Sequence, residues 1–240
     1  MTEMNWTRRS LLRVAAAAFF TPALTRASGA WMPRVSENLG DLKEDTLAWL
    51  AQMGLEWVVL QGTDEVDRNR KGYWSEEDIR AVQEKCAAHG LKLASLMIPL
   101  AWLTPAMLGK PERDPAISNI VRSIRAGGKC GVAMFEWRWS PDFKWGDDVG
   151  YFDEPGRGGA VYKAFDYSRV AGKPPFEDLG AISRETVRER MNYFLERVLP
   201  AADEAGVRLS LHPKDPPVKS MRGVERILTN TDQIEEFVDS

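Results

Sequence analysis

Short apolar runs alternate with amphipathic segments along most of the chain after residue 30. Five of these runs predict β-strands, at residues 34–38, 57–60, 91–98, 131–137 and 207–211. Apolar positions at helical spacing predict helices over 43–53, 75–90, 114–127 and 183–205, and one more from residue 231. Strands that alternate with helices through short connections form parallel sheets with right-handed crossovers. The pattern therefore predicts an α/β fold with about five strand–helix units.

Two parallel architectures have this order of elements, the doubly wound sheet and the (β/α)8 barrel. No GxGxxG motif follows the first strand, which disfavours a dinucleotide-binding doubly wound sheet. Polar residues gather instead near the strand ends, where a parallel barrel places its active site. These residues are Glu37, Asn38, Gln61, Glu136, Arg138, His212 and Asp215. We therefore predict a parallel (β/α)8-type TIM barrel with about five units present, whereas a complete barrel takes roughly 250 residues.

One connection is much longer than the others. Residues 137–182 separate the fourth strand from the helix that begins at 183, and they include WRWSPDFKWGDDVGYFDEPGRGGAVYKAFDY. Long connections in compact domains are usually functional or disordered, and the aromatic content disfavours disorder. On the barrel hypothesis this loop leaves the active-site face, so we predict a lid or substrate wall. The alternative is a mobile surface insertion.

The first 30 residues have the pattern of an export signal. Arg8 and Arg9 precede the apolar stretch 14–20, and small residues follow near residue 30. A basic start, a short apolar region and a small-residue end are typical of a secretory signal, and paired arginines indicate the twin-arginine route. We therefore predict a signal segment over 1–30, a partial barrel over 31–240 and a periplasmic location. The alternative is the amphipathic start of a cytoplasmic protein.

The composition is that of an ordinary globular protein, with 44% hydrophobic and 28% charged residues among 240. A net charge of −3 argues against a surface that binds nucleic acid or an anionic membrane. The apolar stretch near the N-terminus is too short for a permanent membrane span. Cys86 and Cys130 form no CxxC motif, so we predict two buried free thiols.

His212 stands where the fifth strand meets the run HPKDPP. At the carboxyl end of a barrel strand, a neutral imidazole nitrogen is well placed to coordinate a divalent metal ion. The prolines stiffen the backbone, which positions Asp215 to bind the metal ion, orient the imidazole or contact the substrate. A structural role for His212 is the alternative, since a catalytic metal usually has three protein ligands. His89, the other histidine, is explained by the carboxyl end of its helix.

Four further side chains are candidates for catalysis or substrate binding. Glu136 can act as a metal ligand, as a base or as an ion-pair partner. Arg138 and Arg157 can clamp a substrate carboxylate, because the planar guanidinium matches its two oxygens, although exposed salt bridges are the alternative. We predict catalytic roles for Asp215 and Glu136, and substrate binding by Asn38, Arg138 and Arg157.

Five stretches carry a family pattern. The most specific is LHPKDPP at 211–217, which is followed by RGVERIL at 222–228. The supporting stretches are RVSENL at 34–39, GKPERDPAISNIVRSIRAGGKCGV at 109–132 and GRGGA at 156–160. Together, and in their order along the chain, these stretches resemble the mannonate dehydratase family over nearly all of residues 31–240. The resemblance implies a xylose-isomerase-like (β/α)8 barrel that lacks its C-terminal part.

The resemblance also implies an activity. The family consists of hydro-lyases that convert D-mannonate to 2-keto-3-deoxy-D-gluconate in hexuronate breakdown, with Mn²⁺ or Fe²⁺ as cofactor. It implies that His212 is the first metal ligand, while the family's cysteine, second histidine and aspartate ligands come from strands beyond residue 240. Neither Cys86 nor Cys130 matches that cysteine, so this partial chain is expected to be inactive alone. Lys214 stands where the family has aspartate, which places a base beside the expected metal ion.

Two other functions remain open. A sugar isomerase or epimerase on the same barrel also uses a metal ion at the strand ends, and a downstream Glu-Asp-His-Glu set would identify it. An exported sugar-acid-binding protein that kept the pocket and lost the metal ion is the non-enzymatic alternative. The sequence predicts a small sugar acid as the partner of the dehydratase, and it leaves open whether the chain forms a homo-oligomer.

Overall fold

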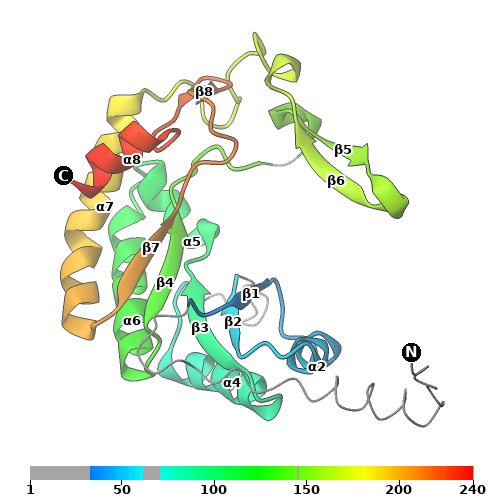
Figure 1. Cartoon of the computed structure of the whole chain (residues 1–240). Coiled ribbons are helices and arrows are strands. Elements are labelled where there is room, and N and C mark those ends of the chain that lie inside the picture. The colour runs from blue at the N-terminus through cyan, green and yellow to red at the C-terminus, as the bar shows by residue number, and fades with distance from the viewer. Residues whose placement is uncertain (1–32, 62–70, 145, 240) are drawn as a thin grey trace, which may run out of the picture. The chain divides into compact units, whose positions relative to one another are not determined.

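The computed structural model describes residues 33–61, 71–144 and 146–239, and its compact unit begins at Val35. Five parallel strands form one sheet in the order β1-β2-β3-β4-β7 (Figure 1). They are β1 (Ser36–Leu39), β2 (Trp57–Leu60), β3 (Lys92–Met97), β4 (Met134–Arg138) and β7 (Arg208–His212). The strands follow one another in chain order, as in a barrel, whereas a doubly wound sheet reverses its order. The predicted α/β fold with five parallel units is confirmed.

Helices connect the strands of the sheet. They are α2 (Glu44–Gln52), α4 (Glu76–Ala88), α5 (Leu100–Met107), α6 (Arg113–Lys129), α7 (Arg184–Ala205) and α8 (Thr231–Val238). The five predicted helices correspond to α2, α4, α6, α7 and α8. Ser75 begins α4 with a capping box, since its side chain accepts from the Asp78 amide and the Asp78 carboxylate accepts from the Ser75 amide. Side chains of Ser183 and Asn230 cap α7 and α8 in the same position.

The face of the sheet toward the helices is apolar from strand to strand. Leu39, Leu60, Leu96 and Phe135 are successive register partners across β1 to β4, and all four are buried. Phe135 lies so close to α6 that a Cβ on Gly127 would stand 2.3 Å from its ring. Helix α6 continues past Gly127 to Lys129, so the predicted end at 127 was wrong. The small residue serves close packing here rather than helix termination.

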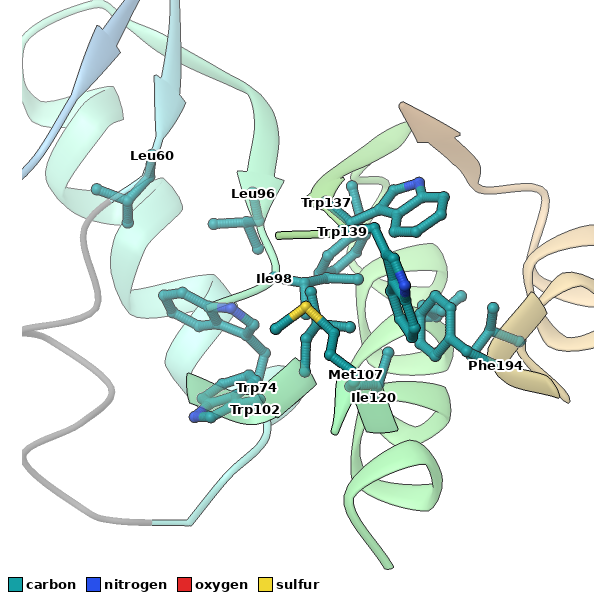
Figure 2. Packing of buried hydrophobic residues seen from close by; sticks show 14 of the residues in the cluster. Leu60, Trp74, Leu96, Ile98, Trp102, Met107, Ile120, Trp137, Trp139 and Phe194 are labelled. Carbon is teal, nitrogen blue, oxygen red and sulfur yellow. The ribbon is translucent and has the colours of Figure 1, made fainter. Parts of the chain in front are cut away.

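Tryptophan side chains fill the core around β4. Trp137 and Trp139 lie with their ring centroids 6.2 Å apart, and Phe194 of α7 lies 5.3 Å from the first and 5.4 Å from the second (Figure 2). Trp74 and Trp102 form a second edge-to-face pair, with centroids 6.4 Å apart. Large rings of this kind contribute much of the apolar area that holds helices to a sheet.

The long connection after β4 has regular structure. It contains η1 (Asp147–Val149), β5 (Tyr151–Pro155), η2 (Arg157–Gly159), β6 (Val161–Phe165) and η3 (Tyr167–Arg169). Strands β5 and β6 form an antiparallel hairpin, drawn in yellow-green in Figure 1, and Tyr151 and Phe165 at its base pack against the core. The long connection predicted over 137–182 therefore contains a hairpin and three short 3₁₀ turns. Later, β8 (Ser220–Met221) and β9 (Val224–Glu225) form a smaller hairpin.

The prediction for the two cysteines can be compared with the described residues. Cys86 is buried and Cys130 is half-buried, both as free thiols, so the prediction of two buried thiols holds fully only for Cys86. Burial raises the pKa of the Cys86 thiol to about 11. Within the described ranges no helix combines the length and the apolarity needed to cross a bilayer. The predicted signal over 1–30 lies outside the described residues.

Candidate active site

The candidate residues share the face of the sheet that lies opposite the helices. Side chains alternate along a strand, and the buried aromatic residues of β4 face α6 and α7, so Glu136 and Arg138 face the other way. The β4–β7 register pairs Glu136 with Ser210 and Arg138 with His212. Asn38 lies on this face too, because it alternates with a buried leucine of β1. The structure therefore brings Asn38, Glu136, Arg138 and His212 to one face.

The ring of His212 is held by the backbone next to it. Its Nδ1 lies 2.7 Å from the carbonyl oxygen of Pro213. A carbonyl oxygen only accepts, so Nδ1 must carry the proton and donate it. The neutral ring then has its lone pair on Nε2, which is the form that a metal ligand needs. The side chain of His212 is exposed on its face of the sheet.

Arg138 is a half-buried cation at the centre of this face. Its Nε is buried and has no hydrogen-bond partner among the described residues. The guanidinium carbon lies 5.0 Å from the ring centroid of Phe143. Burial lowers the pKa of Arg138, while the negative charges of Glu136 and Asp215 oppose that change. Arg138 thus lies within electrostatic reach of both predicted catalytic carboxylates.

Tyr151 is a site residue that the sequence did not indicate. It begins β5 at the base of the hairpin. Burial raises the pKa of the Tyr151 hydroxyl, and the negative charge of Asp215 raises it further. The electrostatic effect of Asp215 on both Tyr151 and Arg138 shows that the hairpin base and the end of β4 approach the same carboxylate. The role of the hairpin as a lid or substrate wall stays a prediction.

A buried ion triad lies behind the HPKDPP segment. The carboxylate of Asp142 accepts hydrogen bonds from Lys214 Nζ and, at 2.7 Å, from Arg226 Nε. Its Oδ2 also forms an ion pair with Arg226 Nη2 at 2.7 Å. Burial alone would raise the pKa of Asp142, but the two cations more than offset burial and the pKa is lowered. Burial lowers the pKa of Lys214 to about 8, against the opposing effect of Asp142. Lys214 is therefore a buried member of the ion triad, with its side chain 5% exposed.

The remaining predicted residues fall outside this cluster. Arg157 lies in η2, the turn that joins β5 to β6, where its exposed guanidinium bonds to no described residue. His89 is the C-cap of α4, as predicted, and its Nε2 lies 2.7 Å from Glu44 Oε2. Among the described residues no group of three or more His, Cys, Asp or Glu side chains could hold a metal ion. In that part of the chain His212 fits one position of a metal site, and the full set is not there.

Comparisons with known proteins agree with the motifs. Residues 164–240 match the family model "D-mannonate dehydratase (UxuA)". The chain is 31% identical over 185 residues to mannonate dehydratase of Streptococcus agalactiae serotype Ia, covering 69% of this chain and 53% of that protein. The Thermotoga maritima mannonate dehydratase is 29% identical over 193 residues, with the same coverage of 69% and 53%.

A solved structure extends this similarity to the fold. The crystal structure of mannonate dehydratase from Streptococcus suis serotype 2 matches with a TM-score of 0.74 at 28% identity, over 88% of this chain and 62% of that chain. The resemblance predicted from the motifs is confirmed. The chain spans about half the length of the curated relatives it matches.

Proposed function

We infer that this chain, a relative of the mannonate dehydratases in sequence and in structure, forms the first part of the active site of a hydro-lyase that dehydrates D-mannonate to 2-keto-3-deoxy-D-gluconate. The observation that carries this proposal is the position of Arg138 and His212. They are register partners at the carboxyl ends of two adjacent parallel strands, on the face opposite the helices. A barrel enzyme builds its active site at that end of its strands.

In this proposal one side chain binds the substrate carboxylate and two others transfer protons. Arg138, whose buried Nε has no partner in the described part of the chain, would bind the carboxylate of the sugar acid through its planar guanidinium. Removal of the proton at C2 needs a base, and departure of the hydroxyl at C3 needs an acid. Glu136 and Asp215, both within electrostatic reach of Arg138, are the candidates for these two tasks. The enol that forms then becomes the keto acid.

A divalent metal ion, Mn²⁺ or Fe²⁺, is part of the proposal. Such an ion would stabilise negative charge that develops near the substrate carboxylate. His212 supports this assignment, since its Nε2 is left with the lone pair by the bond from Nδ1 to Pro213. Its partner ligands would come from the part of the relatives that this chain does not span.

A chimera tests the proposal. The part of the Streptococcus agalactiae mannonate dehydratase that this chain does not cover is fused after residue 240, and keto-acid formation from D-mannonate is measured with Mn²⁺ present. The chimera is expected to form the keto acid, whereas the 240-residue chain alone is expected to form none, because its described residues supply one ligand of a metal site.

Two results would count against this assignment. Keto-acid formation by the 240-residue chain alone, at a rate close to that of the chimera, would contradict the ligand count. A folded, manganese-loaded chimera that leaves D-mannonate unchanged but interconverts ketoses would replace the dehydratase with the isomerase alternative. Circular dichroism of each protein serves as the control for folding.

Export is a separate proposal that rests on residues 1–30. A fusion of these residues to a folded reporter is expected to carry it into the periplasm by the twin-arginine route, which transports folded proteins. Conversion of Arg8 and Arg9 to lysine is expected to stop that transport. Undiminished periplasmic reporter in the double-lysine variant would reject the twin-arginine route.

A further inference from the structure

We propose that the ion triad of Asp142, Lys214 and Arg226 is a positioning device for His212. It acts by fixing the peptide unit between Pro213 and Lys214, whose carbonyl oxygen holds the imidazole proton on Nδ1. The use of Nε2 for a metal ion rests on the proposed function, whereas the choice of tautomer does not.

The triad joins three segments that are far apart in the chain. Asp142 lies in the connection after β4, Lys214 lies just after β7, and Arg226 follows β9. The exposed fractions of the three side chains are 0%, 5% and 4%. One carboxylate thus holds two cations in a buried setting, where charge-assisted hydrogen bonds are strong and geometrically demanding. Any shift of one segment would break bonds to the other two.

The bonds lead from the triad to the peptide next to His212. Arg226 Nη1 donates to the carbonyl oxygen of Pro216 at 2.8 Å, which ties the triad to the backbone of the proline-rich run. The amide of Lys214 donates to the carbonyl oxygen of Leu228 at 3.3 Å, two residues beyond Arg226. The segments 214–216 and 226–228 are therefore held to each other both by side chains and by backbone.

One peptide plane connects this arrangement with the imidazole. The amide N–H of Lys214 and the carbonyl of Pro213 belong to the same planar unit, so fixing one end orients the other. The carbonyl end accepts from Nδ1 of His212 at 2.7 Å. An unconstrained neutral imidazole exchanges between two tautomers, but a fixed acceptor at Nδ1 selects one of them. The lone pair is then always on Nε2.

If the triad only stabilised the fold, its loss would leave the tautomer of His212 unchanged, so the stabilising and positioning roles can be distinguished by experiment. Replacement of a buried ion triad by apolar residues of similar size is often neutral or stabilising. The triple variant Asp142→Leu, Lys214→Met, Arg226→Met is therefore expected to fold. It keeps the backbone bond from Lys214 to Leu228 and loses the side-chain bonds that hold segments 214–216 and 226–228 in place. A stability measurement alone would not reveal the positioning role, so the tautomer of His212 is the required readout.

The chain is well suited to this measurement because it has only two histidines. Nitrogen-15 labelling of histidine gives one ring signal set for each, at a pH where both rings are neutral. His212 is expected to be Nδ1-protonated, and His89 to be Nε2-protonated because its Nε2 lies 2.7 Å from the Glu44 carboxylate. The spectrum of the wild-type chain therefore contains its own reference. No metal ion or substrate is added, so the result is independent of the dehydratase assay.

In the triple variant, the ring nitrogens of His212 are expected to shift to values averaged over both tautomers, while those of His89 stay unchanged. Arg226→Lys, which keeps the charge and loses the bond to Pro216, is expected to shift His212 part of the way. If the triple variant does not fold, the Arg226→Lys variant alone tests the positioning role. A pure Nδ1-protonated His212 in either folded variant, or a wild-type His212 protonated on Nε2, would overturn the proposal.

Discussion

His212→Ala is expected to remove bound Mn²⁺ from the chimera and to lower keto-acid formation by more than about a hundredfold. Loss of a residue that only supports a metal ligand costs up to about a hundredfold, and loss of the ligand itself should cost more. The expectation follows from the position of the ring. Its Nε2 lone pair faces the side of the sheet that carries Arg138, and the described residues provide no group that could substitute for it. Metal content is measured by elemental analysis after gel filtration, and activity with D-mannonate.

The second histidine provides the matched control. His89→Ala removes the contact with Glu44 at the end of α4 and is expected to leave both metal content and turnover unchanged. Because the two variants make the same chemical change, a difference between them reflects position alone. A His212→Ala chimera that still holds one manganese ion per chain would remove His212 from the ligand set, and with it the metal-binding part of the proposed function.

The positions of the strands and most helices could be predicted because their signals are local. The expected strand 57–60 coincides with β2, whose residues are apolar throughout and are followed by a polar glutamine. The helix expected from Ser75 begins there because the cap and its acidic partner stand three residues apart. Helix α5 (Leu100–Met107) was missed, since its sequence LAWLTPAM is apolar except for one threonine and so shows no polar face, and Pro105 lies inside it.

The candidate site was predictable in part, and the limit has a physical cause. Glu136, Arg138 and His212 follow from the period of two along a strand and from the convergence of parallel strand ends. Arg157 was proposed because its guanidinium could bind a substrate carboxylate together with that of Arg138, and the fold places it in the turn between β5 and β6. Tyr151 and the ion triad had no local signal. Asp142 and its cations are 72 and 84 residues apart in the chain, and only the fold brings them together.

Asp142→Asn is expected to lower the free energy of unfolding by about 3–5 kcal/mol, the usual cost of removing one partner from a buried ion pair. The amide can still accept a hydrogen bond, but it leaves the charges of Lys214 and Arg226 buried without a counterion. Urea denaturation of the 240-residue chain at neutral pH measures the change. Asp178→Asn, the same substitution in an exposed ion pair with Lys144, is the control and is expected to show no measurable change.

The pH dependence of this difference tests whether the charge of Asp142 is the cause. In the folded protein the pKa of Asp142 lies below its usual 3.8, because Lys214 and Arg226 outweigh the effect of burial. A carboxylate with a lowered pKa contributes stability that is fully present above the unfolded value and is lost as the pH falls through the folded value. The part of the difference between wild type and Asp142→Asn that comes from the Asp142 charge is therefore expected to shrink as the pH falls below 3.8. A difference that persists unchanged in acid would mean that shape, and not the charge that holds the two cations, accounts for the loss.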